Sequence, residues 1–146
     1  MAYKTKFYPE NTSKYIGNAN NIICRSLWER KVCKWMDSNV NVVRWGSEEL
    51  SIPYISPKDN KVHKYYPDFI AEVKTKEGNI ETFLIEVKPK KQTIEPKRKK
   101  TKSYISESIT YKINTSKWEA ASKFCQKEGW KFIILTEEHL FPKGNK

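Results

Sequence analysis

The sequence is poor in the residues that bind soft metals or build disulfide frameworks. It contains three cysteines and two histidines among 146 residues. Cys24, Cys33 and Cys125 are widely spaced and include no CxxC pair. A zinc cluster and a disulfide framework are therefore not expected, and we predict three reduced, buried thiols.

Long apolar runs are absent as well. No stretch approaches the roughly 18 apolar residues that a transmembrane helix requires. Residues 1–6 (MAYKTK) lack the apolar region of a signal peptide. These absences predict an intracellular protein without a membrane partner.

The chain is instead rich in positive charge and in aromatic residues. It has 28 Lys and Arg against 17 Asp and Glu, a net charge of +11, and five tryptophans. A chain of this length buries about two-thirds of its unfolded surface, which is enough for one core. We therefore expect one basic, folded domain over residues 1–146, because a disordered basic tail would carry fewer aromatic residues.

The excess positive charge is concentrated in one segment. Residues 88–102 hold eight basic residues and one acidic residue, a local net charge of +7. Residues 89–102 contain almost no aliphatic side chains, so we predict an exposed loop there. A basic run taken alone fits a solvated or targeting segment as well as a binding surface.

Apolar periodicity and turn residues predict a fold that contains both helices and strands (α/β in the broad sense), of the α+β class. An irregular arm (residues 1–21) and a helix (22–37) precede a β-meander. We expect the region 105–113 to be extended in part, and Gly129 to end a later helix. The expected strands are 41–45, 49–54, 62–73, 80–88 and 130–135, and the later helices are 116–127 and a short one at 137–141.

Two acidic residues of the predicted hairpin should lie side by side. A turn centred at Glu77 places Asp68 directly opposite Glu86, with Cβ atoms about 5 Å apart. Like charges at this distance repel, so we expect a cation between them. Two carboxylates favour Mg²⁺ or Mn²⁺ as that cation, and Lys88 projects from the same strand face.

Glu29 is a charged residue on the apolar side of the first predicted helix. Two interpretations remain open. In one, Ser26 caps the helix and the Glu29 carboxylate returns to the Ser26 backbone N–H as a capping box. In the other, the helix begins near Asn21, and Glu29 binds a metal ion or a buried cation.

These residues suit the hydrolysis of a phosphodiester. A metal ion held by two carboxylates would neutralise the phosphate and activate a water molecule, and Lys88 would orient that water or stabilise the transition state. The basic segment would hold the DNA backbone through contacts that are independent of sequence. The candidate DNA-binding residues are Lys90, Lys91, Lys97, Arg98, Lys99, Lys100 and Lys102.

The order Pro67-Asp68 followed by Glu86-Val87-Lys88 resembles the PD-(D/E)xK motif of restriction-endonuclease-like nucleases. The resemblance implies a central mixed β-sheet flanked by helices. It also implies that Asp68 and Glu86 bind Mg²⁺ or Mn²⁺, that Lys88 assists the water, and that Glu29 completes the site. The segments 25–30, 65–69, 84–89 and 113–118 narrow the resemblance to TnsA-type transposon endonucleases.

The whole chain is also similar to the head completion nucleases of T-even-like phages. That similarity implies action on DNA in the host cytoplasm during virion assembly, leaves association with the virion open, and suggests head or portal proteins as partners. Two alternatives remain: a non-catalytic basic DNA-binding morphogenesis protein, and a structure-selective repair or recombination endonuclease.

Overall fold

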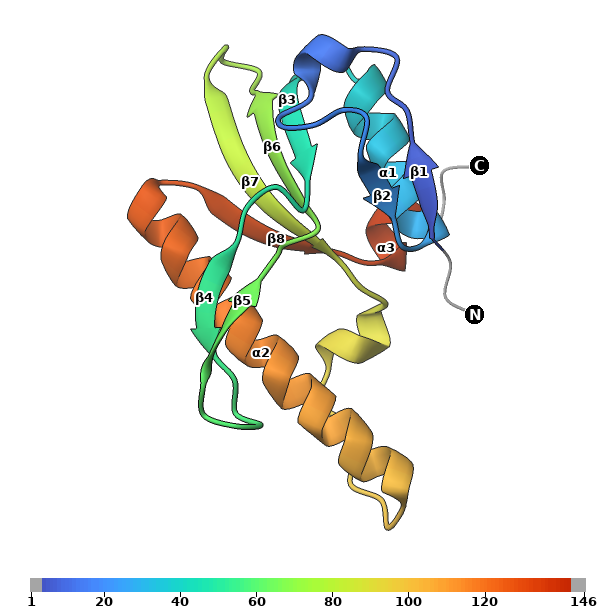
Figure 1. The fold of residues 1–146 in the computed structure, drawn as a ribbon, viewed down its shortest axis with the longest axis vertical. Coiled ribbons are helices and arrows are strands. Elements are labelled where there is room, and N and C mark those ends of the chain that lie inside the picture. The colour runs from blue at the N-terminus through green and yellow to red at the C-terminus, as the bar shows by residue number, and fades with distance from the viewer. Residues whose placement is uncertain (1–3, 143–146) are drawn as a thin grey trace.

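The computed structural model describes residues 4–142 (Figure 1). Among these residues, none of the helices has both the length and the apolar character needed to cross a bilayer. In chain order the elements are β1 (Thr5–Phe7), η1 (Thr12–Lys14), β2 (Ile22–Cys24), α1 (Leu27–Ser38), β3 (Val42–Ser47), β4 (Ile52–Ile55), β5 (Val62–Tyr65), β6 (Phe69–Lys74), β7 (Ile80–Val87), η2 (Lys90–Thr93), α2 (Lys102–Glu128), β8 (Lys131–Leu135) and α3 (Glu137–Leu140).

The centre of the fold is a four-stranded mixed sheet with the order β3-β6-β7-β8. β6 pairs antiparallel with β3 and with β7, whereas β8 runs parallel to β7. The chain reaches β8 from β7 through the crossover helix α2 (Figure 1). The sequence-based prediction of a mixed central sheet flanked by helices is confirmed, and the arrangement is consistent with a restriction-endonuclease-like fold.

Two apolar clusters form because neighbouring residues of β6 and β7 point to opposite faces of the sheet. Phe69, Ala71 and Ile85 pack in a cluster with α1 and the N-terminal segment. Leu84 packs in a second cluster with α2 and the β4–β5 hairpin. The three cysteines are buried and free. The central sheet is therefore packed on both faces.

The predicted strand 62–73 is interrupted, which changes the meander. Tyr66, Pro67 and Asp68 separate β5 from β6, because proline has no N–H to donate to a strand ladder. β5 pairs with β4, in a two-stranded sheet of its own. The simple meander was therefore wrong in detail, since β3 pairs with β6 and the β4–β5 hairpin is an insertion between them.

The largest difference from the sequence prediction is the length of α2. The region 105–113, expected to be extended in part, is helical from Lys102 onward. Thr101 caps the helix by accepting a hydrogen bond from the Tyr104 N–H at 3.2 Å, and Gly129 ends it with a positive φ of 76°. The predicted loop 89–102 also contains the short helix η2. The end of α2 near Lys102 projects away from the sheet (Figure 1).

The N-terminal region also differs from the expected irregular arm. Thr5–Phe7 forms β1, which pairs antiparallel with β2 at Ile22–Cys24. The first helix therefore begins at Leu27 rather than at Ile22, with Ser26 as its N-cap. The arm still covers the core, because Phe7 and Tyr15 are buried against Trp45. Residues 1–3 of the predicted arm lie outside the described residues.

Candidate active site

Strands β6 and β7 pair in the register expected from the sequence. Phe69 lies opposite Ile85, and Lys74 lies opposite Ile80. Continued by one residue, this register places Asp68 opposite Glu86. The chain continues into Lys88 directly after β7, and the Lys88 N–H donates to the Leu135 carbonyl of β8 at 3.0 Å.

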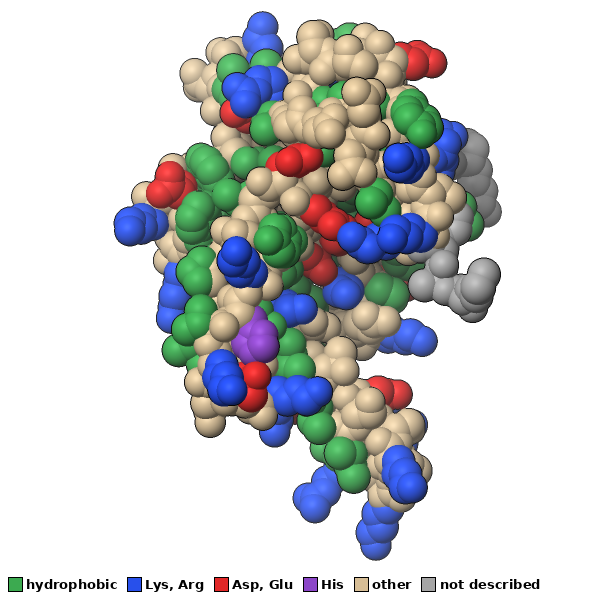
Figure 2. All heavy atoms as spheres, in the orientation of Figure 1, with side chains coloured by type: hydrophobic (Ala, Val, Ile, Leu, Met, Phe, Trp, Pro, Cys, Tyr) green, Lys and Arg blue, Asp and Glu red, His purple; other side chains and the backbone are tan. Residues whose placement is uncertain are grey.

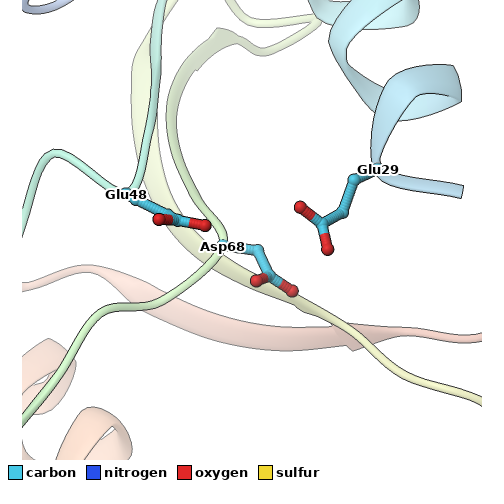
Figure 3. Close-up of side chains that lie close together, drawn as sticks. All are labelled: Glu29, Glu48 and Asp68. Atoms are coloured by element: carbon cyan, nitrogen blue, oxygen red, sulfur yellow. The ribbon is translucent and has the colours of Figure 1, made fainter. Parts of the chain in front are cut away.

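Three carboxylates from separate parts of the chain meet at this end of the sheet. Glu29, Glu48 and Asp68 each offer an oxygen, and these oxygens all lie within 4.8 Å of one another. Figure 3 shows that Glu29 comes from the first turn of α1, Glu48 from the segment after β3, and Asp68 from just before β6. The side chains point toward a common space between the three elements.

The position of Glu29 combines features of both sequence-based interpretations. Ser26 Oγ accepts a hydrogen bond from the Glu29 N–H at 3.1 Å, so Ser26 is the helix cap. Glu29 Oε1 accepts from the Arg25 N–H at 3.3 Å, not from that of Ser26. Burial raises the pKa of Glu29, and the negative charges of Glu48 and Glu86 add to this effect. Glu29 thus belongs to a capped first turn and still faces the other acids.

Glu48 is the acidic residue that sequence reasoning missed. Its backbone has a φ of 54°, and its N–H donates to the Asp68 carbonyl at 3.1 Å. Its carboxylate accepts two hydrogen bonds from the Arg25 guanidinium, at 2.8 and 3.1 Å. No motif marks Glu48. Only the pairing of β3 with β6, which the sequence analysis did not identify, brings it beside Asp68.

Asp68 is strongly affected by burial and by the neighbouring acids. Burial, followed by the charges of Glu86 and Glu29, holds the pKa of Asp68 well above its usual range. Asp68 Oδ2 accepts a hydrogen bond from the Val87 N–H at 2.8 Å. Within residues 4–142, no hydrogen bond reaches its Oδ1.

Glu86 lies near the cluster but is not part of the three-oxygen group. The Tyr65 hydroxyl donates to Glu86 Oε1 at 2.6 Å, and Lys88 Nζ lies 3.7 Å from Oε2. Burial raises the pKa of Glu86, and Tyr65, Lys88 and Lys117 partly offset that rise. Glu86 therefore already has neighbours that compensate its charge. Sequence reasoning missed Tyr65 and Lys117, which no motif spacing links to Glu86.

Lys88 lies where a substrate can approach the acids. Its side chain is 29% exposed. A surface cleft between the first turn of α1 and the segment after β7 is lined by Glu29 and Lys88, together with Leu27 and Gln92. Lys88 can therefore contact a group bound in this cleft while its ammonium stays beside Glu86.

The donor set of the cluster fits a hard divalent cation. All three residues of the group offer carboxylate oxygens, which Mg²⁺ and Mn²⁺ prefer to the nitrogen and sulfur ligands of softer metals. The raised pKa values of Asp68 and Glu29 indicate that their charges are poorly compensated by protein groups. A divalent ion would relieve this repulsion.

The predicted DNA-binding residues occupy two different environments. Lys90 is engaged by α3, since its N–H donates to Glu137 Oε1 at 2.7 Å and its Nζ lies 3.1 Å from Glu138 Oε2. Figure 2 shows acidic side chains in a recess near the middle of one face, with Lys and Arg beside them and more at the projecting end of the molecule. The remaining candidates are all exposed and form no ion pair with another described residue: Lys91, Lys97, Arg98, Lys99, Lys100 and Lys102.

Comparisons with known proteins identify similar endonucleases and nucleases. Residues 39–137 match the family described as TnsA-like endonuclease N terminal. That range includes Glu48, Asp68, Glu86 and Lys88, and Glu29 precedes it. The chain is also 39% identical over 152 residues to the head completion nuclease of Enterobacteria phage T4, with 100% of this chain and 99% of that protein covered. Membership of an endonuclease family implies a divalent metal ion. The chain therefore belongs to the family of TnsA-like endonucleases.

Proposed function

We propose that this protein is a metal-dependent DNA nuclease of the PD-(D/E)xK type that acts in phage head completion. The observation that carries the proposal is the meeting of Glu29 and Asp68 within 4.8 Å of each other and of Glu48, with Glu86 and Lys88 at the adjoining end of β7. The name and full-length similarity of the phage T4 relative support the role in virion assembly. We further propose that it works in the host cytoplasm and meets head or portal proteins there.

Each site residue has a distinct proposed role. Asp68 and Glu29 bind Mg²⁺ or Mn²⁺. The Glu86 carboxylate, which lies beside Lys88, contributes further negative charge to the metal site. The bound ion would neutralise charge on the phosphate and lower the pKa of the attacking water. The Lys88 ammonium orients this water or stabilises the negative charge that develops on the phosphate. The Tyr65 hydroxyl fixes the Glu86 carboxylate through its 2.6 Å hydrogen bond.

The basic residues beyond the cleft would hold the substrate. Lys91, Lys97, Arg98, Lys99, Lys100 and Lys102 are exposed, and contacts from such side chains to phosphates are independent of sequence. Lys90 would have to leave Glu138, a pair whose two side chains are both exposed and therefore held weakly. This arrangement would position the DNA backbone over the acidic cluster.

Substitution of Lys88 tests the proposed activity directly. We expect Lys88→Ala to lower DNA cleavage in Mg²⁺ or Mn²⁺ by roughly 10²–10³-fold, because a positioned cation is lost from the transition state. Lys74→Ala, at an exposed lysine on β6, serves as the control and should cleave like the wild type. Cleavage is measured on supercoiled plasmid, linear duplex and four-way junctions, with EDTA as the metal-free condition.

The outcomes separate the alternatives left open by the sequence. A non-catalytic DNA-binding protein would give equal, metal-independent traces of cleavage for the wild type and Lys88→Ala. A structure-selective endonuclease would cut the junction far faster than the linear duplex. Comparable cleavage of linear and branched DNA, strongly reduced by Lys88→Ala, is the result that our proposal requires.

A second prediction separates the two features of the first turn of α1. Glu29→Gln should lower cleavage by at least roughly 10²-fold without lowering stability, since the amide oxygen can still accept from the Arg25 N–H. Ser26→Ala should do the reverse, lowering the free energy of unfolding by about 1 kcal/mol through the lost cap and leaving most activity. The measurements are initial cleavage rates and urea unfolding curves. Equal activity of Glu29→Gln and the wild type would remove Glu29 from the site.

A further inference from the structure

We propose that Glu48 is an additional ligand of the divalent ion, and that Arg25 is its temporary counter-ion, released to bind a DNA phosphate when the ion arrives. This inference rests on the proposed function and extends it by two residues. The Arg25–Glu48 ion pair would then separate during the reaction: Glu48 would bind the metal ion and Arg25 a phosphate. Both residues would act in addition to the acids that the PD-(D/E)xK motif identifies.

The backbone places Glu48 at the site independently of Arg25. The Glu48 N–H donates to the Asp68 carbonyl at 3.1 Å, which ties the end of β3 to the residue that precedes β6. The side chain therefore starts beside Asp68, and its carboxylate oxygen lies within 4.8 Å of oxygens from both Asp68 and Glu29. In Figure 3 the Glu48 carboxylate points toward Asp68.

Arg25 now satisfies the carboxylate that a metal ion would need. Its Nε donates to Glu48 Oε2 and its terminal nitrogen donates to Oε1, so both oxygens of Glu48 are engaged by one guanidinium. The negative charges of Glu29 and Asp68 also act on Arg25, and together with Glu48 they raise the pKa of its guanidinium. The positive charge of Arg25 thus interacts with all three carboxylates. A divalent ion placed among them would compensate them better and compete with Arg25.

Arg25 is free to move once the ion binds. Its side chain is 52% exposed, whereas that of Glu48 is 26% exposed. A planar guanidinium forms paired hydrogen bonds with phosphate as readily as with carboxylate. Arg25 directly precedes Ser26, which lines the same cleft as Glu29 and Lys88. A phosphate bound in that cleft would therefore lie beside the released side chain.

The chain offers a closely matched control pair. Arg44 lies 3.8 Å from Glu72, and the two side chains are 54% and 28% exposed. Glu72 is four residues along the chain from Asp68, a spacing of about 13 Å in a strand. Substitutions of Arg44 and Glu72 therefore change the net charge in the same way as substitutions of Arg25 and Glu48, but at residues outside the acidic cluster.

The first experiment measures Mn²⁺ binding to the full chain by titration calorimetry in the absence of DNA. Glu48→Gln is expected to raise the Kd for Mn²⁺ by about 10-fold or more, and Arg25→Gln to lower it several-fold because a competing cation is removed. Glu72→Gln and Arg44→Gln should stay within about twofold of the wild type, because salt screens charges beyond about 10 Å. Circular dichroism verifies that each variant is folded.

The second experiment follows Arg25 to the DNA. In a Lys88→Ala background, anisotropy of a labelled 20-base-pair duplex is measured in EDTA and in Mn²⁺. Arg25→Gln should weaken DNA binding by about 10-fold in Mn²⁺, the value of one charge-assisted contact, and by much less in EDTA. Equal effects of Arg25→Gln in the two conditions would overturn the exchange of partners.

The results also distinguish this inference from the proposed function. Unchanged Mn²⁺ affinity in Glu48→Gln, or weaker Mn²⁺ binding in Arg25→Gln, would overturn the inference. If Asp68→Asn nevertheless abolished Mn²⁺ binding, the proposed function would stand without Glu48. If Asp68→Asn bound Mn²⁺ like the wild type, the proposed metal site at Asp68 would be wrong, and the proposed function with it.

Discussion

Asp68→Asn is expected to lower metal-dependent DNA cleavage by more than roughly 10³-fold, because the residue that joins the acid cluster to β7 can no longer bind a cation with a full negative charge. The amide oxygen can still accept the hydrogen bond from the Val87 N–H that Asp68 Oδ2 accepts now. The fold should therefore survive. Initial rates on a plasmid in Mg²⁺ and Mn²⁺ measure the loss.

The same substitution should stabilise the metal-free protein at neutral pH. Burial and neighbouring acids raise the pKa of Asp68 in the folded state, so the folded protein holds this proton more tightly than the unfolded chain. The contribution of Asp68 to stability is therefore complete below pH of about 4, the unfolded pKa, and is lost as the pH rises through the folded pKa. Asp68→Asn avoids that loss, and its melting temperature in EDTA should exceed that of the wild type at pH 7.5 but not at pH 4.

Asp59→Asn is the control for both effects. Asp59 is exposed, and the Lys61 N–H together with His63 lowers rather than raises its pKa. The control should cleave DNA normally and should gain no stability at neutral pH. A metal-free Asp68→Asn protein less stable than the wild type at pH 7.5 would mean that the Asp68 carboxylate is compensated by the protein alone.

Neutralising the basic segment before α2 should produce the second large effect. Replacement of Lys97, Arg98, Lys99 and Lys100 by Gln should weaken DNA binding by roughly 10²–10³-fold at 0.1 M salt. It should also flatten the slope of log K against log salt by up to about 3.6, since each of the four phosphate contacts contributes about 0.9 to the slope. The loss should be the same for unrelated duplex sequences. Anisotropy titrations at several salt concentrations give both quantities.

A control set of four exposed lysines elsewhere on the chain tests whether DNA binding depends on the position of the basic residues or on the total charge. Lys74 and Lys76 lie at and just after the end of β6, and Lys123 and Lys127 lie near the end of α2 opposite Lys102. Replacing these four by Gln changes the net charge equally, but the salt slope should fall by less than about 1. Equal slopes for the two quadruple variants would contradict a DNA-facing segment at residues 97–100.

The sequence was sufficient to predict the hairpin that carries the motif. Alternating side chains fix the faces of β6 and β7, and Gly78, with a φ of 89°, fixes their turn. The opposition of Asp68 and Glu86 follows from these two local features. The roles of Glu29, Asp68, Glu86 and Lys88 stay predictions until metal binding and cleavage are measured.

Glu48 and the true start of α1 depend on long-range pairing. Glu48 reaches Asp68 because β3 skips the β4–β5 hairpin and pairs with β6. Ile22–Cys24 has an apolar pattern that fits a helix, but it pairs with β1. Neither partner could be identified from local periodicity, since a short apolar run fits a strand or a helix equally well.

The sequence of the first half of α2 contains a pattern that indicates a helix. Ile105, Ile109 and Ile113 recur every four residues, which is the spacing of one helix face. Serine and β-branched residues between them lower the intrinsic helix propensity and favoured an extended reading. Ile105 and Ile109 remain exposed, at 59% and 44%. This part of the helix is therefore held largely by its Thr101 cap and by continuity with the packed half.

Anomalous diffraction from a crystal grown with Mn²⁺ would locate a metal ion bound between Asp68 and Glu29. We expect a manganese peak at about 2.0–2.3 Å from carboxylate oxygens of both Asp68 and Glu29, with Lys88 on the adjacent cleft wall. A crystal saturated with Mn²⁺ in which this space stays without a peak, while Asp68 and Glu29 keep only protein partners, would contradict metal-dependent cleavage at this site.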